Sequence, residues 1–172
     1  VVRYGNIMGS RGSVIPLFID QAKKGIIKIT DQNMTRFNIT LEMGVNMVIW
    51  SLLNSIGGEV FVPKIPSYRI LDLAEAIAPN CKKEIVGVRA GEKIHEEMIT
   101  VSDSYSTIDL GKYFAILPMD GLLKEKYVKR NIKFKDFEVG TSYNSLQNKK
   151  FLSLGELRDL IIDNVDKEFA PY

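Results

Sequence analysis

Apolar and polar residues alternate along the chain at spacings typical of helices in some stretches and of strands in others. The clearest helix is expected at residues 41–56, where apolar residues form one continuous stripe: Leu41, Val45, Val48, Ile49, Leu52, Leu53 and Ile56. Thr40 is suited to cap this helix, and Gly57 with Gly58 to end it. Trp50 falls just beside the stripe, so we expect it to pack against other residues.

Shorter elements of both kinds follow from the same spacing rules. Further helices are expected at residues 14–24, 67–78, 92–98 and 153–165, and strands at residues 1–4, 26–30, 34–40, 59–62, 83–88 and 113–117. Ser67 would cap the second of these helices, and Ser153 with Glu156 would form a capping box at the last. Strands and helices that alternate in this way predict an α/β chain.

The start of the chain combines a strand, a glycine-rich loop and a helix start. Apolar residues 1–4 are followed by a helix that is expected to begin near Val14, with Ser13 at its N-cap position. The loop between them holds Gly5, Gly9 and Gly12. A helix N-terminus offers unpaired N–H groups to an anion, and Arg11 adds a guanidinium group, which suggests a site for a phosphorylated ligand. The glycine spacing is neither the dinucleotide nor the P-loop pattern, so an ordinary strand-to-helix connection is the alternative.

Two further arginines and an asparagine suit the same kind of ligand. Arg36 lies among apolar residues. It could be a structural residue in a salt bridge, or its guanidinium group could bind a diphosphate in a bidentate manner. Arg89 and Glu92 stand three positions apart, where the Arg could bind phosphate and the Glu a ribose diol; a local ion pair is the alternative. Asn6 can hydrogen-bond a diphosphate or a sugar hydroxyl, and a turn residue is its alternative.

Composition and net charge argue against several classes of protein and of site, but they do not identify a function. The chain has 172 residues and a formal net charge of +2, which is too small to indicate nucleic acid or an anionic membrane as a partner. The single Cys81 excludes an internal disulfide and fits a reducing, cytoplasmic location. No apolar run approaches the length of a membrane span. His95 is the only histidine, with no metal-spaced partner and no triad partner, so neither a metal site nor a catalytic residue is expected.

Two segments indicate possible partners of the chain and its place in a longer protein. Residues 124–135 are basic and interleaved with Tyr127 and Phe134, and a solvated strand or an oligomer contact is favoured there over nucleic acid. The chain starts with Val1 inside an expected strand, so we expect it to be the C-terminal part of a longer protein.

The stretch RYGNIMGSRGSVIP (residues 3–16) resembles the extended short-chain dehydrogenase/reductases that act on nucleotide sugars, most of all the inverting UDP-N-acetylglucosamine 4,6-dehydratases. Four later motifs resemble the same family in order: TDQNMTRF (30–37), GEVFVPKIP (58–66), VRAGEKIHE (88–96) and TSYNS (141–145). The piece FVPKIP favours the branch that makes the precursor of pseudaminic acid. The capsule-type UDP-sugar dehydratase/epimerases share most of the rest and are the alternative.

This resemblance implies a Rossmann-like α/β fold, of which the chain supplies the last strands and helices of the sheet and the substrate-binding subdomain. Residues 1–25 would end the dinucleotide-binding domain. Residues 26–172 would mainly form the UDP-sugar-binding subdomain and a C-terminal extension. The full protein would bind NADP and convert UDP-N-acetylglucosamine into a 4-keto-6-deoxy sugar with inverted C5. It would be a cytoplasmic homo-oligomer without nucleic-acid or membrane partners.

Matched position by position, the resemblance implies a substrate site and one cofactor contact. Asn6 would contact the substrate, and the backbone of Ile7 would lie near the nicotinamide. The substrate pocket would be lined by Arg11, Ser13, Val14 and Ile15, and the UDP would be held by Thr35, Arg36, Arg89 and Glu92. Ala90 stands where the family usually has proline, which changes the stiffness of the loop and leaves Arg89 and Glu92 in place.

The catalytic groups of the family have no match in these residues. Its Gly-rich cofactor fingerprint, its Tyr-x-x-x-Lys pair and the Asp and Lys that handle the C5 proton and the leaving hydroxyl are absent, so the chain alone is expected to be inactive. A non-catalytic module that binds nucleotides or nucleic acid is the alternative of another class, and it predicts a steep salt dependence of binding. A truncated, poorly folded product is a third.

Overall fold

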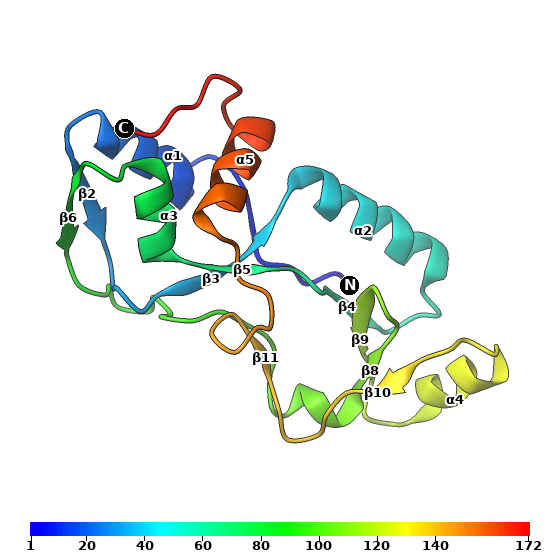
Figure 1. Ribbon diagram of the computed structural model, residues 1–172. Coiled ribbons are helices and arrows are strands. Elements are labelled where there is room, and N and C mark those ends of the chain that lie inside the picture. The colour runs from blue at the N-terminus through cyan, green and yellow to red at the C-terminus, as the bar shows by residue number, and fades with distance from the viewer. The chain divides into compact units, whose positions relative to one another are not determined.

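The computed structural model describes residues 1–172, and the chain forms two compact units of mixed α/β structure (Figure 1). The first unit consists of Val1–Tyr4, Glu42–Lys64 and Glu97–Asn144; the second consists of Gly5–Leu41, Ile65–Glu96 and Ser145–Tyr172. Each unit has a hydrophobic core of its own. The division of function at residue 25 stays a prediction.

The second unit holds a three-stranded sheet and a separate strand pair. In the sheet, the central strand β3 (Thr35–Ile39) is parallel to β1 (Asn6–Ile7) and antiparallel to β5 (Ser67–Arg69). The separate pair is parallel and consists of β2 (Ile26–Ile29) and β6 (Lys82–Ile85).

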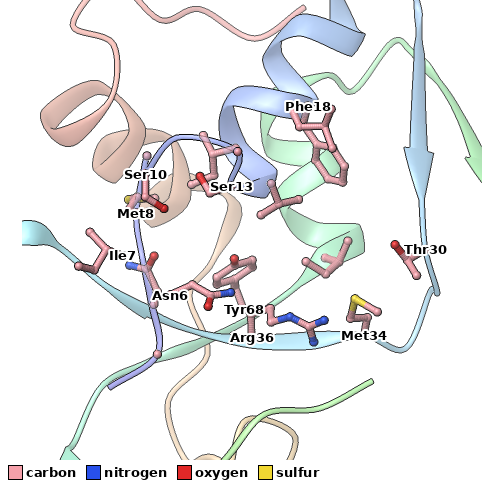
Figure 2. Close-up of a pocket in the computed structure, with 18 of the residues that line it drawn as sticks. Asn6, Ile7, Met8, Ser10, Ser13, Phe18, Thr30, Met34, Arg36 and Tyr68 are labelled. Atoms are coloured by element: carbon pink, nitrogen blue, oxygen red, sulfur yellow. The ribbon is translucent and has the colours of Figure 1, made fainter. Parts of the chain in front are cut away.

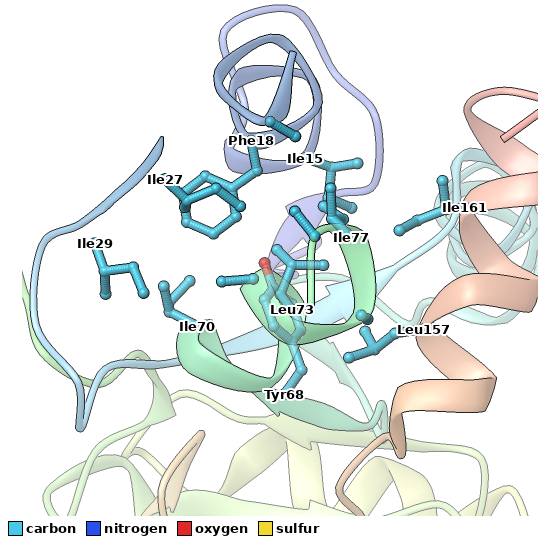
Figure 3. Close-up of a cluster of buried hydrophobic side chains, with 14 of the residues drawn as sticks. Ile15, Phe18, Ile27, Ile29, Tyr68, Ile70, Leu73, Ile77, Leu157 and Ile161 are labelled. Carbon is cyan, nitrogen blue, oxygen red and sulfur yellow. The ribbon is translucent and has the colours of Figure 1, made fainter. Parts of the chain in front are cut away.

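Three helices of the second unit surround its core. They are α1 (Val14–Ala22), α3 (Ile70–Ile77) and α5 (Leu154–Asn164). Their buried side chains meet those of β2 in one cluster, which includes Phe18, Ile27, Leu73, Leu157 and Ile161 (Figure 3). The expected capping box at the start of α5 is confirmed, because the Ser153 hydroxyl accepts the Glu156 N–H and the Glu156 carboxylate accepts the Ser153 N–H.

The first unit is built on a four-stranded antiparallel sheet. Its strands lie in the order β10 (Lys135–Asp136), β8 (Thr107–Asp109), β9 (Tyr113–Ile116) and β4 (Val60–Pro63). Val2 adds a parallel bridge to Phe61 of β4. The remaining elements are the pair β7 (Glu97–Ile99) and β11 (Tyr143–Asn144), the short 3-10 helix η1 (Asp103–Ser106), and α4 (Leu122–Lys129). The basic stretch 124–135 therefore forms most of a helix rather than a strand.

Helix α2 (Leu41–Asn54) confirms the expected element, but its apolar stripe is not the face that packs. The buried residues are Gly44, Met47 and Ser51. Trp50 packs beside them, with its ring centroid 5.3 Å from that of Phe61 and 4.6 Å from that of Tyr113. The stripe is exposed, and Leu53 keeps 80% of its accessible surface. Met47 and Trp50 of this helix pack into the hydrophobic cluster of their unit, and their side chains therefore define the inward face.

Three expectations from the sequence are wrong. Residues 1–4 form no strand, since only Val2 makes an isolated bridge there, and the first strand β1 begins at Asn6. Residues 92–98 contain no helix, and β7 begins at Glu97. Ser145 holds the backbone of Glu96 from a distant segment: Glu96 N donates to Ser145 Oγ at 2.9 Å, and Ser145 N donates to Glu96 O at 2.7 Å. Ser67 caps no helix, because its backbone pairs with Phe37 in the sheet and α3 starts only after Arg69. Tertiary pairing overrides local helix signals at both places.

Candidate functional site

A cavity of about 710 Å³ opens in the second unit beside the glycine-rich loop (Figure 2). Its walls come from segments far apart in sequence, namely β1 and the following loop, the start of α1, β3, β5 and residues 89–92. All the expected site residues except Thr35 line it: Asn6, Ile7, Arg11, Ser13, Val14, Ile15, Arg36, Arg89 and Glu92. Phe18, Met34 and Ile70 add an apolar wall.

Glycines shape the loop between β1 and α1. Gly9 and Gly12 have φ angles of +72° and +75°, which residues with a Cβ rarely adopt. At Gly5, a Cβ would come within 2.7 Å of the Cβ of Phe37, so β3 can approach only a glycine at this point. The loop backbone therefore runs close along the cavity.

The start of α1 faces the cavity without a side-chain cap. Ser13 has the extended backbone of an N-cap residue, but its hydroxyl makes no capping bond and has no hydrogen-bond partner in the chain. Val14 and Ile15 lie in the cavity wall. The first N–H groups and the positive end of the helix dipole are thus available to an anion.

Arg36 is held rigidly at the cavity and is only 11% exposed. Its Nη1 donates to the carbonyl oxygens of Thr35 at 2.8 Å and Ile94 at 3.0 Å. Two carboxylates lie at the outer limit of an ion pair: Glu92 Oε1 at 4.0 Å from Nη2, and Glu96 Oε1 at 3.8 Å from Nε. Arg36 is therefore both structurally anchored and presented to the cavity, so its two interpretations are compatible.

Arg11 and Arg89 differ from Arg36 in having exposed guanidinium groups with no partner within the chain. The alternative for these two residues, a local ion pair between Arg89 and Glu92, does not form. Instead, Glu92 Oε2 accepts the backbone N–H of Arg89 at 3.4 Å. Two free cationic groups therefore stand at the cavity, ready for an anionic ligand.

Thr35 lies away from the cavity. Its Oγ1 is 2.8 Å from His95 Nδ1 and 2.7 Å from Ser145 Oγ, and its side chain is buried. Successive side chains of a strand point to opposite faces, so Thr35 and Arg36 cannot both face one cavity. This alternation was available in the sequence; the contact of Thr35 with a substrate stays a prediction.

The carboxyl group of Glu96, 3.8 Å from Arg36 Nε, has an altered pKa. Burial raises the pKa of the Glu96 carboxyl, and the N–H of Phe37 together with Arg36 and Lys93 opposes the rise. The Phe37 N–H donates to Glu96 Oε2 at 3.0 Å. As the pH falls, Glu96 therefore takes up a proton earlier than an exposed glutamate does.

Five polar residues that line the cavity had not been identified from the sequence, namely Ser10, Lys28, Thr30, Asn38 and Tyr68, and the last two are deeply buried. Asn38 and Tyr68 line the cavity, although they are only 4% and 3% exposed. Asn38 follows Arg36 by two positions on β3 and so shares its face, a signal that strand alternation contains. Tyr68 is the direct partner of Arg36 across β5 and β3, which only the strand pairing reveals.

Comparison with known proteins shows the family. A family model described as polysaccharide biosynthesis protein matches residues 1–118. The chain belongs to this family. It is 45% identical, over 94% of its length, to a UDP-N-acetylglucosamine 4,6-dehydratase (inverting) of Campylobacter jejuni, of which it covers 50%. It is also 40% identical, over 98% of its length, to a UDP-glucose 4-epimerase of Rickettsia conorii, of which it covers 51%.

A solved structure agrees with this family membership. The chain matches the X-ray structure of Pen from Bacillus thuringiensis with a TM-score of 0.79 and 37% sequence identity, over 94% of this chain and 49% of that one. This confirms a mixed α/β chain that corresponds to part of a nucleotide-sugar dehydratase or epimerase. The chain spans about half the length of the relatives it matches.

None of the helices combines the length and the apolar character that a membrane crossing requires. No group of three His, Cys, Asp or Glu side chains lies close enough together to hold a metal ion.

Proposed function

We propose that this chain is the UDP-sugar-binding part of an NADP-dependent, inverting UDP-N-acetylglucosamine 4,6-dehydratase. One observation carries the proposal: Arg11, Arg36 and Arg89 line the same cavity as the uncapped start of α1. Three forked donors and a helix N-terminus suit a diphosphate. The 45% identity to a relative of that activity supports the identity of the sugar nucleotide.

The remaining lining residues receive roles consistent with their places. Glu92 is exposed enough to accept hydrogen bonds from a ribose diol, and the apolar wall suits a planar base. Asn6, Ser13, Val14 and Ile15 would face the sugar. Thr35 would act by supporting Arg36, since its carbonyl oxygen accepts a hydrogen bond from Arg36 Nη1.

NADP would be held mostly by groups outside this chain. Of the residues present, Ile7 at the end of β1 lines the cavity and offers an apolar surface and backbone to a nicotinamide ring. When bound, NADP would accept a hydride from C4 of the sugar and return it to C6. A place in the synthesis of pseudaminic acid or another surface glycan, a cytoplasmic location and homo-oligomeric assembly are part of the same proposal.

A UDP-sugar dehydratase/epimerase of the capsule type is the second candidate, favoured by relatives such as the Rickettsia epimerase at 40% identity. Both candidates require the same UDP site. The configuration of the sugar ring in the product that the whole protein forms from UDP-N-acetylglucosamine distinguishes them, because the proposed dehydratase inverts C5 alone and an epimerase activity inverts another ring carbon.

The UDP site is tested by calorimetric titration of the chain with UDP and UDP-N-acetylglucosamine. We expect Arg89→Ala to weaken binding of both about 10- to 100-fold, because one charge-assisted contact to phosphate is lost. Arg130→Ala is the matched control, since this exposed arginine of α4's C-cap lies outside the cavity and should leave the affinity unchanged. Absence of UDP binding, or equal effects of the two substitutions, would contradict the proposal.

A further inference from the structure

Tyr68 is placed to meet the same ligand group as Arg36. The two residues are direct partners in the antiparallel pair of β5 and β3. Residues directly opposite in such a pair project from the same face with neighbouring Cβ atoms. Both side chains line the cavity, and Figure 2 shows them next to one another. Whatever group Arg36 holds therefore lies within reach of the Tyr68 side chain.

None of the side-chain hydrogen bonds of the chain involves the Tyr68 hydroxyl, although the residue is 97% buried. The fully buried atoms without a partner are Ser13 Oγ and Ser51 Oγ, so the Tyr68 hydroxyl instead reaches the open space of the cavity. A hydroxyl in a cavity wall that makes no bond within the chain is open to a partner in the cavity. The other deeply buried tyrosine with an altered pKa shows the usual arrangement. The hydroxyl of Tyr127 donates to Glu59 Oε1 at 3.2 Å.

The charge state of Tyr68 makes it a donor. Burial raises the pKa of the Tyr68 hydroxyl, Glu96 raises it further, and Arg36 opposes the rise. The phenol is therefore protonated throughout the physiological pH range and offers one O–H to an acceptor. Beside a guanidinium group, the acceptor that fits is an anionic oxygen.

We infer that the Tyr68 hydroxyl donates a hydrogen bond to a phosphate oxygen of the nucleotide bound by Arg36. This makes Tyr68 a ligand-contacting residue of the cavity, and it rests on the proposed UDP site. The contact explains why a full phenol, rather than a phenylalanine, stands at this position of the sheet.

The test compares Tyr68→Phe with the unchanged chain, using UDP and uridine as ligands. The substitution removes one oxygen and keeps the ring. We expect the dissociation constant for UDP to rise about 5- to 30-fold, as for the loss of one hydrogen bond to a charged group. The affinity for uridine, measured by NMR titration, should not change, since uridine has no phosphate. The melting temperature should not fall, because no bond within the chain is lost.

Tyr127→Phe is the matched control. It removes a phenol that is bonded to Glu59 outside the cavity, so it should lower the melting temperature and leave the affinity for UDP unchanged. Unaltered UDP affinity in Tyr68→Phe would overturn the inference while the proposed site stands. Equal losses for UDP and uridine would overturn the assignment to phosphate. If the unchanged chain bound no UDP, the proposed function would fail and the inference with it.

Discussion

Glu59 carries the most deeply buried carboxylate of the chain, with 2% of its surface exposed. Its Oε1 accepts the Ile56 N–H at 2.7 Å and the Tyr127 hydroxyl at 3.2 Å, and its Oε2 accepts the Gly57 N–H at 2.9 Å. Burial alone would raise the pKa of Glu59, but these hydrogen bonds to its charged form hold the pKa below its usual value. A single acidic side chain thus closes the turn that follows α2.

This carboxylate gives stability a defined pH dependence. A group with a lowered folded-state pKa stabilises the fold above its unfolded pKa, near 4.5, and loses that contribution as the pH falls through the folded value. We expect Glu59→Gln to lower the melting temperature at neutral pH by about 4–8 °C, equivalent to about 2 kcal/mol. The difference from the unchanged chain should shrink as the pH falls below 4.5.

Thermal unfolding followed by circular dichroism across the acidic pH range checks this result. Glu125→Gln is the control, because Glu125 is exposed and pairs only with Lys129, at 3.7 Å. Its effect should be small at every pH. A difference between Glu59→Gln and the unchanged chain that stayed constant with pH would show that Glu59 does not stabilise the fold through its charge.

At the scale of elements, two helices of the second unit begin with serine but use it differently. Ser153 donates and accepts in a capping box, whereas the Ser13 hydroxyl is unpaired at the cavity. We expect Ser153→Ala to lower the melting temperature by about 2–4 °C, because the Glu156 N–H at the start of α5 loses its acceptor. Ser13→Ala should leave it within about 1 °C, since no bond within the chain is lost.

Differential scanning calorimetry of the two variants checks this contrast. Equal destabilisation by both substitutions would mean that Ser13 does cap α1 in solution. The uncapped helix start in the proposed anion site would then be wrong.

Elements were predictable where local signals decide the conformation. The capping box at Ser153, the glycines after α2 and the start of α1 near Val14 were all expected, because they depend on neighbouring residues in sequence. The helix expected at residues 92–98 does not form. Ser145, far along the chain, hydrogen-bonds the backbone of Glu96 and holds it out of a helix. The inward face of α2 was not predicted, because Met47 and Trp50, rather than the continuous apolar stripe, pack into the cluster of distant residues that includes Phe61 and Tyr113.

For the whole molecule, the chain corresponds to half the length of its relatives and contains no Tyr-x-x-x-Lys pair or Gly-rich dinucleotide fingerprint. We therefore expect no 4-keto product when these residues are incubated alone with NADP and UDP-N-acetylglucosamine. Mass spectrometry of the sugar nucleotide checks this, with UDP binding in the same sample as the control for a folded site. Loss of water from the sugar would show that the chain carries catalytic groups of its own.

Part of the candidate site could likewise be predicted from residues close together in sequence, and part could not. Asn6, Arg11 and the start of α1 are close together in sequence, so their common site could be inferred from the loop alone. Arg36, Arg89 and Glu92 join them only through the sheet and the segment beside it, and the family motifs pointed to them before any geometry did. Tyr68 and Asn38 belong to no local pattern that the sequence analysis used.

By itself, the sequence determined the family, the kinds of elements and the residues suited to a phosphorylated ligand, because motifs, caps and periodicity depend on residues a few positions apart. Only the tertiary structure decided which side chains face the cavity. Strand pairing placed Tyr68 opposite Arg36, the fold brought Arg89 and Glu92 to the same cavity, and the packing of Met47 and Trp50 left the apolar stripe of α2 exposed. These outcomes depend on contacts between distant segments, whose energies no local pattern contains.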